Sequence, residues 1–155
     1  HGLIRGMPPA LDLAREHALH GLLARLAARG ALRSAHDCAE GGFAVTLAEC
    51  CFDSGGIGAS VDVAKASSDG GIDLAAATLF GESASRVIVS VDPAETASVL
   101  AAAGDAGVPA TRIGTTGGAA IRIAIAGQAI IDCPVSEAEA RWANSLPATM
   151  AGRAA

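Results

Sequence analysis

The sequence predicts an α+β fold in which helices cover a layered, mixed and mostly antiparallel sheet that is partly ferredoxin-like. Segments whose apolar residues recur at helical spacing alternate with segments in which every second residue is apolar. Glycine-bearing links separate three consecutive strand-like segments near the end of the chain. The length of 155 residues suits a single hydrophobic core. We therefore expect one domain over residues 1–150, followed by a frayed tail of small residues over 151–155.

The first third of the chain predicts two helices and a strand. Residues 9–29 place leucines at helical spacings and stop at Gly30, as an amphipathic helix does. Residues 31–36 read as a short extended link, and residues 43–52 as a second, largely buried helix. Residues 57–63 alternate apolar with small or polar side chains, which predicts a strand with one buried face.

The middle of the chain predicts a loop, two helices and a buried strand. Residues 65–71 are polar and indicate a loop, and residues 73–79 favour a short helix. Residues 86–91 form a nearly continuous β-branched run, typical of a central strand. Pro93 fits the first turn of a helix, which we expect to continue over residues 94–103.

The last third predicts three strands and a closing helix. We expect strands over residues 110–115, 120–126 and 129–133, joined as antiparallel hairpins by their glycine-bearing links. Residues 136–144 then predict a helix, with Ser136 as its N-terminal cap.

Composition excludes several classes of function. The chain has 11 Lys and Arg against 16 Asp and Glu, so no basic field is present to attract nucleic acid or an anionic membrane surface. No apolar run reaches the roughly 18 residues that a spanning helix needs. The charge balance and the short apolar runs therefore predict no nucleic-acid partner and no membrane. The four cysteines show no metal-binding or disulfide spacing, which favours reduced thiols in a cytoplasmic protein.

The first candidate site is the turn from His36 to Gly42. Asp37 and Glu40 bring two carboxylates to a helix entrance whose backbone N–H groups are free, so the turn can hold a hydrated cation or an anion. Alternatively, Asp37 or Glu40 only caps the helix and the glycines only permit close packing. Both interpretations fit the residues.

The second candidate site is the loop over residues 80–83, which precedes a buried strand. Gly81 lets the backbone turn sharply, so that successive N–H groups can form an anion nest assisted by the Ser83 hydroxyl and the Arg86 cation. Alternatively, the segment is an ordinary tight turn in which Glu82 is solvated or paired with Arg86. The pattern is too short to exclude either interpretation.

Three further features favour structural roles. Residues 114–118 resemble a phosphate loop but lack a lysine and join two strands, so a hairpin turn fits better. His17 and His20 have no partner spaced to complete a metal site and read as surface histidines. Cys50 and Cys51 lie in an apolar helix without the positive setting that activates a thiol, and read as core residues.

Four stretches resemble one known family. SAHDCAEGGFAVTLAE over residues 34–49 resembles a segment of the C-terminal domain in the aminoimidazole ribonucleotide synthetase superfamily. LFGESASRVIVS over residues 79–90 and VPATRIGTTGG over residues 108–118 resemble stretches of its phosphoribosylformylglycinamidine synthase family. Residues 137–147, which include the tryptophan, resemble the end of the same family. The similarity therefore spans about residues 15–150 and implies the fold of the C-terminal domain of the aminoimidazole ribonucleotide synthetase superfamily.

The resemblance implies an ATP-dependent ligase of purine biosynthesis. The family converts formylglycinamide ribonucleotide to its amidine with ATP, Mg²⁺ and ammonia that a partner glutaminase releases from glutamine. The synthetase works with that glutaminase subunit and a small bridging subunit. Its catalytic histidine, ATP-binding lysine and most Mg²⁺ ligands lie in other synthetase domains, so we expect no catalytic residue and an incomplete active site in this chain.

The resemblance also carries roles to single residues. It places Gly81, Glu82 and Ser83 on the family's substrate-phosphate loop, beside Arg86, and Asp37 on a metal-ligand position. The chain departs from the family where Ala84 replaces a glutamine and where Cys38-Ala39-Glu40 replaces a more polar run. Because these positions belong to the second of two pseudo-symmetric halves, the expected site is structural or holds an auxiliary nucleotide.

Two alternatives stand beside this interpretation. The chain is the matching domain of a sister synthetase for aminoimidazole ribonucleotide, selenophosphate or thiamine phosphate, or it is a stand-alone ferredoxin-like ligand-binding or assembly module. If the other synthetase domains normally cover one face, an apolar patch is exposed and the isolated chain self-associates.

Overall fold

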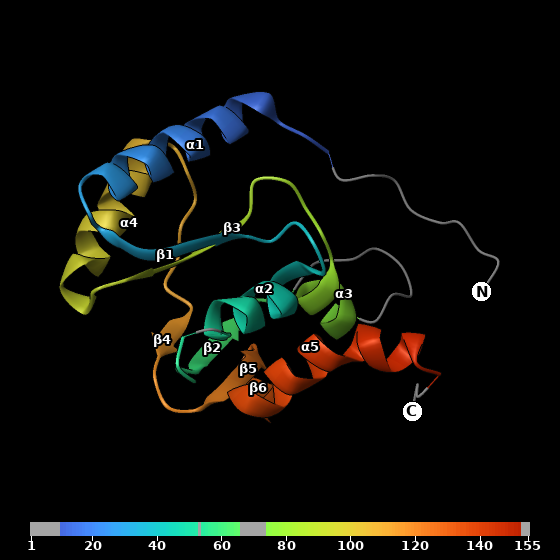
Figure 1. Ribbon diagram of the computed structural model, residues 1–155. Coiled ribbons are helices and arrows are strands. Elements are labelled where there is room, and N and C mark those ends of the chain that lie inside the picture. Colours follow the sequence, from blue (N-terminus) through green and yellow to red (C-terminus); the bar gives the residue numbers. More distant parts are fainter. Residues whose placement is uncertain (1–9, 53, 66–73, 153–155) are drawn as a thin grey trace.

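A computed structural model of the chain describes residues 10–52, 54–65 and 74–152 and confirms the α+β class (Figure 1). The helices within this part are α1 (Leu13–Ala28), α2 (Gly42–Cys51), α3 (Leu74–Phe80), α4 (Thr96–Asp105) and α5 (Val135–Met150), with a 3₁₀ turn, η1 (Pro93–Glu95). The strands are β1 (Leu32–Asp37), β2 (Ala59–Val63), β3 (Val87–Val91), β4 (Gly114–Thr116), β5 (Ala120–Ile125) and β6 (Gln128–Pro134). No helix in these ranges is both long and apolar enough to span a membrane.

The described strands form two sheets rather than one. β1 and β3 pair antiparallel in a two-stranded sheet, and the other four strands follow the order β4-β2-β5-β6. In the larger sheet β2 runs parallel to β5, whereas the β2–β4 and β5–β6 pairs are antiparallel. The mixed, mostly antiparallel pairing is therefore as expected, and its division between two sheets is an additional finding.

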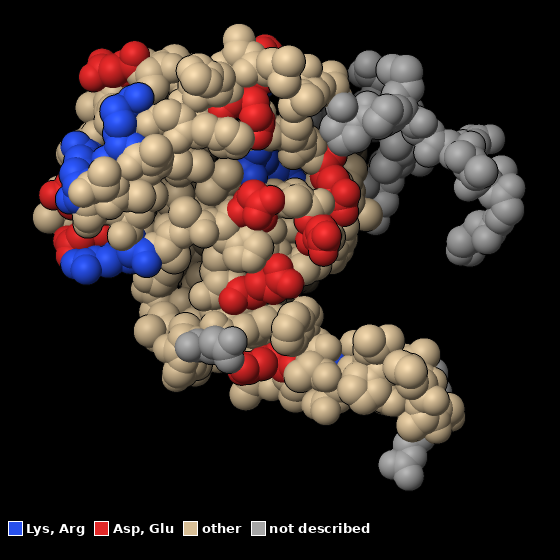
Figure 2. All heavy atoms as spheres, turned by 45° about the horizontal axis from the view of Figure 1, so that its top comes forward, with Lys and Arg blue, Asp and Glu red and all other residues tan. Residues whose placement is uncertain are grey.

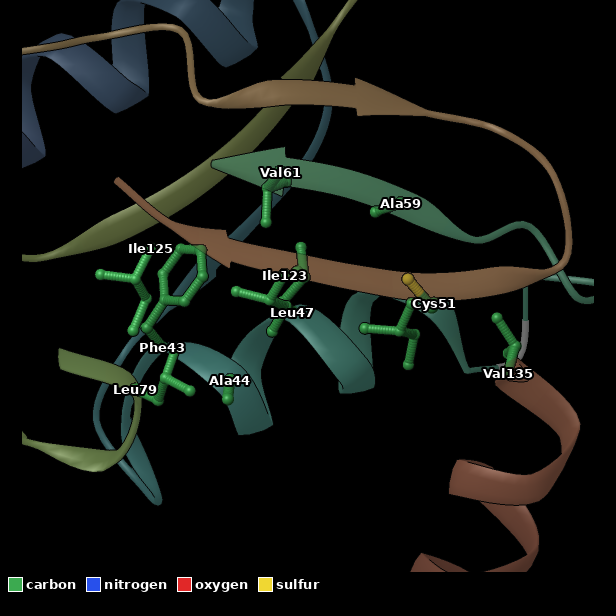
Figure 3. Packing of buried hydrophobic residues seen from close by; sticks show 11 residues of the cluster. Phe43, Ala44, Leu47, Cys51, Ala59, Val61, Leu79, Ile123, Ile125 and Val135 are labelled. Carbon is green, nitrogen blue, oxygen red and sulfur yellow. The ribbon is translucent and has the colours of Figure 1, made fainter. Parts of the chain in front are cut away.

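The main core lies between α2 and one face of the larger sheet (Figure 3). Alternation along β5 directs Ile121, Ile123 and Ile125 into this core, each 6% exposed or less, and leaves Arg122 on the open face. Phe43 and Leu47 of α2 pack against these isoleucines. A second, smaller core joins α1 and α4 beside β1 and β3, and its buried members are Leu22, Leu26, Ala31, Val99 and Ala103.

Two sequence-based expectations about the strands are corrected. The link over residues 31–36 is strand β1, because its backbone pairs with β3 from Leu32 to Asp37. Residues 110–115 and 120–126 do not form a hairpin, because β2 lies between β4 and β5. Gly114 makes this insertion feasible, since a Cβ atom there would lie 2.0 Å from the carbonyl oxygen of Ser60. The expected hairpin between the next two strands is present as β5 and β6.

The last helix also differs from the expectation. α5 starts at Val135 and continues through Pro147 to Met150, well beyond the expected end at residue 144. Its N-terminal cap is Pro134, which makes no side-chain capping bond, so Ser136 is not the cap. Most of the predicted loop over 65–71, residue 73 and the end of the tail over 153–155 lie outside the described residues.

Candidate functional site

A cavity of about 690 Å³ lies where α1 crosses the end of β1 and the start of β3. It brings together the two candidate stretches of the sequence, which are more than 40 positions apart. Its lining residues are Glu16, Leu19, His20, Leu23, Ala35, His36, Asp37, Cys38, Ala39, Glu82, Ser83, Ala84, Ser85, Arg86 and Val87. Asp37, Glu82, Ser83 and Arg86 thus line one cavity, which the sequence did not predict, whereas Gly81 is not among its lining residues.

Two glycines permit close backbone approaches in the candidate stretches. Gly42 has a φ of +73°, and a Cβ atom on it would lie 2.7 Å from the carbonyl carbon of Phe80. A Cβ atom on Gly81 would lie 2.3 Å from the carbonyl oxygen of Ala77. Because real side chains do not tolerate such distances, glycine at position 42 permits the start of α2 and the end of α3 to meet backbone to backbone, and glycine at position 81 permits the chain to turn tightly at the end of α3.

Glu82 caps the start of α2 from outside that helix. Gly41, the N-cap residue, donates its backbone N–H to Glu82 Oε1 at 2.9 Å, and no side chain of its own segment caps the helix. A carboxylate at this end also complements the partial positive charge of the helix. Neither Asp37 nor Glu40 is therefore the cap, and Glu82 is neither simply solvated nor paired with Arg86.

Arg86 closes the loop at the base of the cavity. One terminal nitrogen of its guanidinium, Nη2, donates to the carbonyl oxygen of Gly81 at 2.7 Å, so Gly81 lies at the root of the loop. The backbone carbonyl of Arg86 accepts from the N–H of Cys38 at 2.8 Å, which extends the β1–β3 pairing by one step. Its Nε is buried and has no hydrogen-bond partner among the described residues.

Asp37 is fixed through its backbone and is exposed through its side chain. The buried Thr46 hydroxyl donates to the Asp37 carbonyl at 3.0 Å, whereas the Asp37 side chain is 68% exposed. The adjacent His36 ring lies 3.5 Å from the Glu49 carboxylate, measured from Nε2 to Oε2. The described ranges contain no group of three or more His, Cys, Asp or Glu side chains arranged to hold a metal ion.

The loop that lines the cavity has backbone donors without an acceptor among the described residues. Within the described chain, no acceptor binds the backbone N–H groups of Ser83 and Ala84, and both residues are exposed. Ser85 adopts a φ of +60°, and its hydroxyl donates to the carboxylate of Glu16 on α1. His20 lies one turn further along α1, with its Nε2 3.3 Å from the other Glu16 oxygen, Oε1.

Sequence reasoning missed Glu16 and the position of His20 at this cavity. Their four-residue spacing predicts an ordinary helix-surface pair, and only the crossing of α1 over the loop brings them to the site. His20 remains 69% exposed, in agreement with its assignment as a surface histidine.

Carboxylates outnumber cations around the cavity. Glu16, Asp37 and Glu82 line it together with the single guanidinium of Arg86. Figure 2 shows acidic side chains gathered on the face that includes this region, while basic side chains lie mainly at the end of the molecule near α4. A bare phosphate therefore meets net repulsion here unless a cation accompanies it.

The vicinal cysteines lie outside this chemistry. Burial raises the pKa of the Cys51 thiol, and burial followed by the neighbouring Cys51, Cys38 and Glu49 raises the pKa of Cys50. A raised pKa keeps a thiol protonated and unreactive. Cys51 is a residue of the main core, as expected, whereas Cys50 is half-buried and belongs to neither hydrophobic cluster.

Comparisons with known proteins identify relatives of the whole chain. Residues 4–125 match the family described as AIR synthase related protein, C-terminal domain. The chain is 42% identical over 97% of its length to the phosphoribosylformylglycinamidine synthase subunit PurL of Moorella thermoacetica, and 39% identical over 96% to that of Thermobifida fusca. It spans only about a fifth of these relatives, covering 20% and 18% of their lengths.

Solved structures agree at the level of the fold. PurL of Thermotoga maritima complexed with ATP superposes with a TM-score of 0.72 over 86% of this chain and 23% of that one, at 19% sequence identity. The same protein complexed with FGAR gives 0.72 over 84% of this chain. With a family match over most of its length and this shared fold, the chain belongs to the family of AIR synthase related proteins, C-terminal domain.

Proposed function

We propose that this chain is the C-terminal domain of a PurL-type phosphoribosylformylglycinamidine synthase subunit, and that its cavity binds the phosphates of a Mg²⁺-bound nucleotide. The subunit would convert formylglycinamide ribonucleotide to formylglycinamidine ribonucleotide in the purine pathway, using ATP and ammonia. Identity of 42% to a PurL subunit over nearly the whole chain supports the assignment to that protein. The remaining synthetase domains would supply the catalytic residues.

The observation that carries the phosphate proposal is the loop from Glu82 to Arg86. Its free Ser83 and Ala84 N–H groups and the Ser83 hydroxyl line a cavity with Arg86 at its base. Backbone N–H groups in a turn, assisted by a guanidinium, are a common way of binding phosphate oxygens. Glu82 fixes this loop to the start of α2 and is assigned to positioning rather than to phosphate contact.

Mg²⁺ would reach the cavity with the phosphates rather than in a protein cage. Asp37 is the exposed carboxylate at the rim, whereas Glu16 and Glu82 are already hydrogen-bonded to Ser85 and Gly41. A single carboxylate plus phosphate oxygens and water is the usual protein environment of Mg²⁺. Asp37 would therefore hold the ion, which offsets the acidic rim and bridges it to the phosphates.

Isothermal calorimetry of this chain tests the proposal, with ADP and Mg²⁺ in one series and formylglycinamide ribonucleotide in another. We expect saturable binding of ADP that chelation of Mg²⁺ with EDTA abolishes. Ser83→Asp places a negative charge in the nest and should weaken binding at least tenfold. Ser136→Asp adds the same charge at an exposed position of α5 away from the cavity and should leave binding unchanged.

The two ligands distinguish two roles of the cavity. Binding of formylglycinamide ribonucleotide that Ser83→Asp removes would assign the loop to the substrate phosphate instead of a nucleotide. The absence of heat with both ligands would contradict the phosphate proposal and leave the domain a structural role in the subunit.

The proposal extends to partners and compartment. The relatives are named as subunits, and one solved assembly is titled PurLQS from Thermotoga maritima. We infer that the subunit containing this chain works with a glutaminase subunit, which supplies ammonia, and with a small bridging subunit. The four free cysteines are consistent with assembly in the reducing cytoplasm.

A further inference from the structure

The second half of α5 exposes a row of large apolar side chains. The first half packs on the main core through Val135, which is 1% exposed, and through Ala138. Trp142, Leu146 and Met150 follow at intervals of four residues and are 59%, 67% and 81% exposed. Residues four apart share one helix face, so these three form a continuous stripe. This half of α5 projects beyond the sheet (Figure 1), and it extends from the body of the molecule in Figure 2.

The stripe continues into an apolar groove between α2 and α5. This groove has a volume of about 240 Å³, and the ring of Trp142 leans against that of Phe52 on one side, with 5.6 Å between ring centres. Phe80, which is 53% exposed, lies at the same groove. The groove is lined by apolar side chains and one thiol, from Ala44, Val45, Ala48, Phe52, Phe80, Ile121, Ile123, Ile131, Cys133, Ala138 and Trp142.

The other side of α5 has the polar character of a helix that faces water. Glu137 and Arg141 pair across one turn, with 3.1 Å between Oε1 and Nη2, and Asn144 donates to the carbonyl oxygen of Ala140. A helix with one polar side and a row of exposed Trp, Leu and Met on the other is typical of a docked element. The feature to be explained is therefore what covers the stripe.

The lengths of the matches indicate the occupant. The match to the family covers residues 4–125 and stops before β6 and α5 begin. Relatives about five times as long as this chain nevertheless match 97% of it, which must include most of α5. The helix therefore accompanies the long subunits.

On this basis we propose that the α5 stripe and the adjoining α2–α5 groove dock another domain of the same long subunit. This inference rests on the proposed function, because it takes the chain to be part of a PurL-type polypeptide. The docked domain places a large apolar side chain in the groove beside Trp142 and an apolar helix or strand face along Leu146 and Met150. Large, rigid aromatic side chains beside a groove commonly dominate the stability of such contacts.

Hydrogen exchange with mass spectrometry tests the inference in a full-length subunit. A chimaeric subunit is made in which this chain replaces the matching fifth of the Moorella thermoacetica subunit. Amide hydrogen exchange of α5 in this full-length protein is compared with that in the chain alone. We expect the amides of residues 142–150 to exchange at least tenfold more slowly in the full-length protein. Trp142→Glu and Leu146→Glu should return them to the rate of the isolated chain, because both place a charge in the contact.

Three controls separate docking from misfolding. Asn144→Glu adds the same charge to α5 outside the stripe and should leave the slow exchange intact. Met150→Glu changes the most exposed member of the stripe, which lies outside both buried clusters, and should act in the same direction as Trp142→Glu. Unchanged exchange of β5 and β6 in every variant reports that the domain is folded.

Two results would overturn the inference. Equal exchange of α5 in the chain alone and in the full-length protein would mean that no domain covers the stripe. In the second case, amide exchange of α5 slows as the concentration of the chain alone rises, and it slows no further in the full-length protein. That result would assign the stripe to a second copy of this chain. Calorimetry with ADP and Mg²⁺ does not involve α5, so either result leaves the test of the proposed function independent.

Discussion

Gly42 shows how a single missing methyl group can position a site. It lies at the start of α2 with a φ of +73°, directly against the backbone of Phe80. Any side chain here has to accommodate both an unfavourable backbone conformation and a steric conflict with main-chain atoms that cannot rotate away. The separation between the Asp37 turn and the Glu82 loop therefore depends on this glycine.

We expect Gly42→Ala to lower the free energy of unfolding by about 3 kcal/mol, from backbone strain and overpacking together. Gly55→Ala is the matched control, because Gly55 has a φ of +75° but no atom within 4 Å of the added Cβ, and it should cost only about 1 kcal/mol. Urea denaturation measures both values. Equal losses in the two variants would contradict the role of the Phe80 contact.

At the scale of elements, α2 combines an N-terminal contact with the cavity and a C-terminal pair of thiols, of which Cys51 lies in the main core and Cys50 is half-buried. Burial is the largest cause of the raised pKa at both Cys50 and Cys51, starting from an ordinary value of 9.0. Because the unfolded chain loses these protons at a lower pH than the folded chain, the folded state binds more protons just above pH 9. Stability from this source is complete below pH 9 and falls as pH rises further.

We therefore expect the free energy of unfolding to decline above pH 9, by at most about 1.4 kcal/mol per pH unit for each thiol. The chain contains no tyrosine, so no phenol titrates in this range. Replacing both residues, Cys50→Ala with Cys51→Ala, should flatten the decline between pH 9 and 10. An equally steep decline in the double variant would assign the effect to other groups.

The sequence predicts elements well where local patterns decide and poorly where distant segments meet. The alternation in β5 predicts both the strand and its buried face, and the glycine-bearing link at Gly127 and Gln128 predicts the β5–β6 hairpin, whose turn lies one residue earlier, at Ala126 and Gly127. The role of Gly114 could not be predicted from a local pattern. β2 can lie between β4 and β5 because the backbone of Gly114 closely approaches that of Ser60, and only the assembled sheet brings these two residues together. The last helix was expected to end at residue 144, yet α5 continues through Pro147 to Met150, at the cost of the backbone bond that a proline cannot donate.

The same distinction applies to the candidate site. Asp37, Glu82, Ser83 and Arg86 were identified from two short motifs, and the fold brings them to one cavity. Glu16 was not identified, because its role depends on the packing of α1 over the loop. The capping of α2 by Glu82 could not be predicted either, since the two partners are 41 positions apart.

At the scale of the molecule, two hydrophobic clusters lie on either side of the cavity. α1, α4 and the two-stranded sheet share the smaller cluster, and the larger sheet with α2 holds the main one. A two-stranded sheet has little stability of its own and depends on the helices packed on it. The cavity wall that α1 supplies is therefore expected to be the more easily opened side.

Leu26→Ala tests this expectation, because Leu26 is 3% exposed in the smaller cluster. We expect a loss of about 3 kcal/mol and faster amide exchange mainly in β1 and β3, with β5 and β6 less affected. Ile123→Ala, at a position 1% exposed in the main cluster, should speed exchange in both sheets. Uniform acceleration in both variants would show instead that the two clusters unfold as one unit.

The position of Trp142 gives the chain an intrinsic optical reporter. It is the only tryptophan in a sequence without tyrosine, so nearly all near-ultraviolet fluorescence comes from one indole. That indole touches Phe52 on one side and is 59% exposed at the α5 stripe. Its emission wavelength therefore reports the polarity at this one surface, and it should shift to the blue when the stripe is covered.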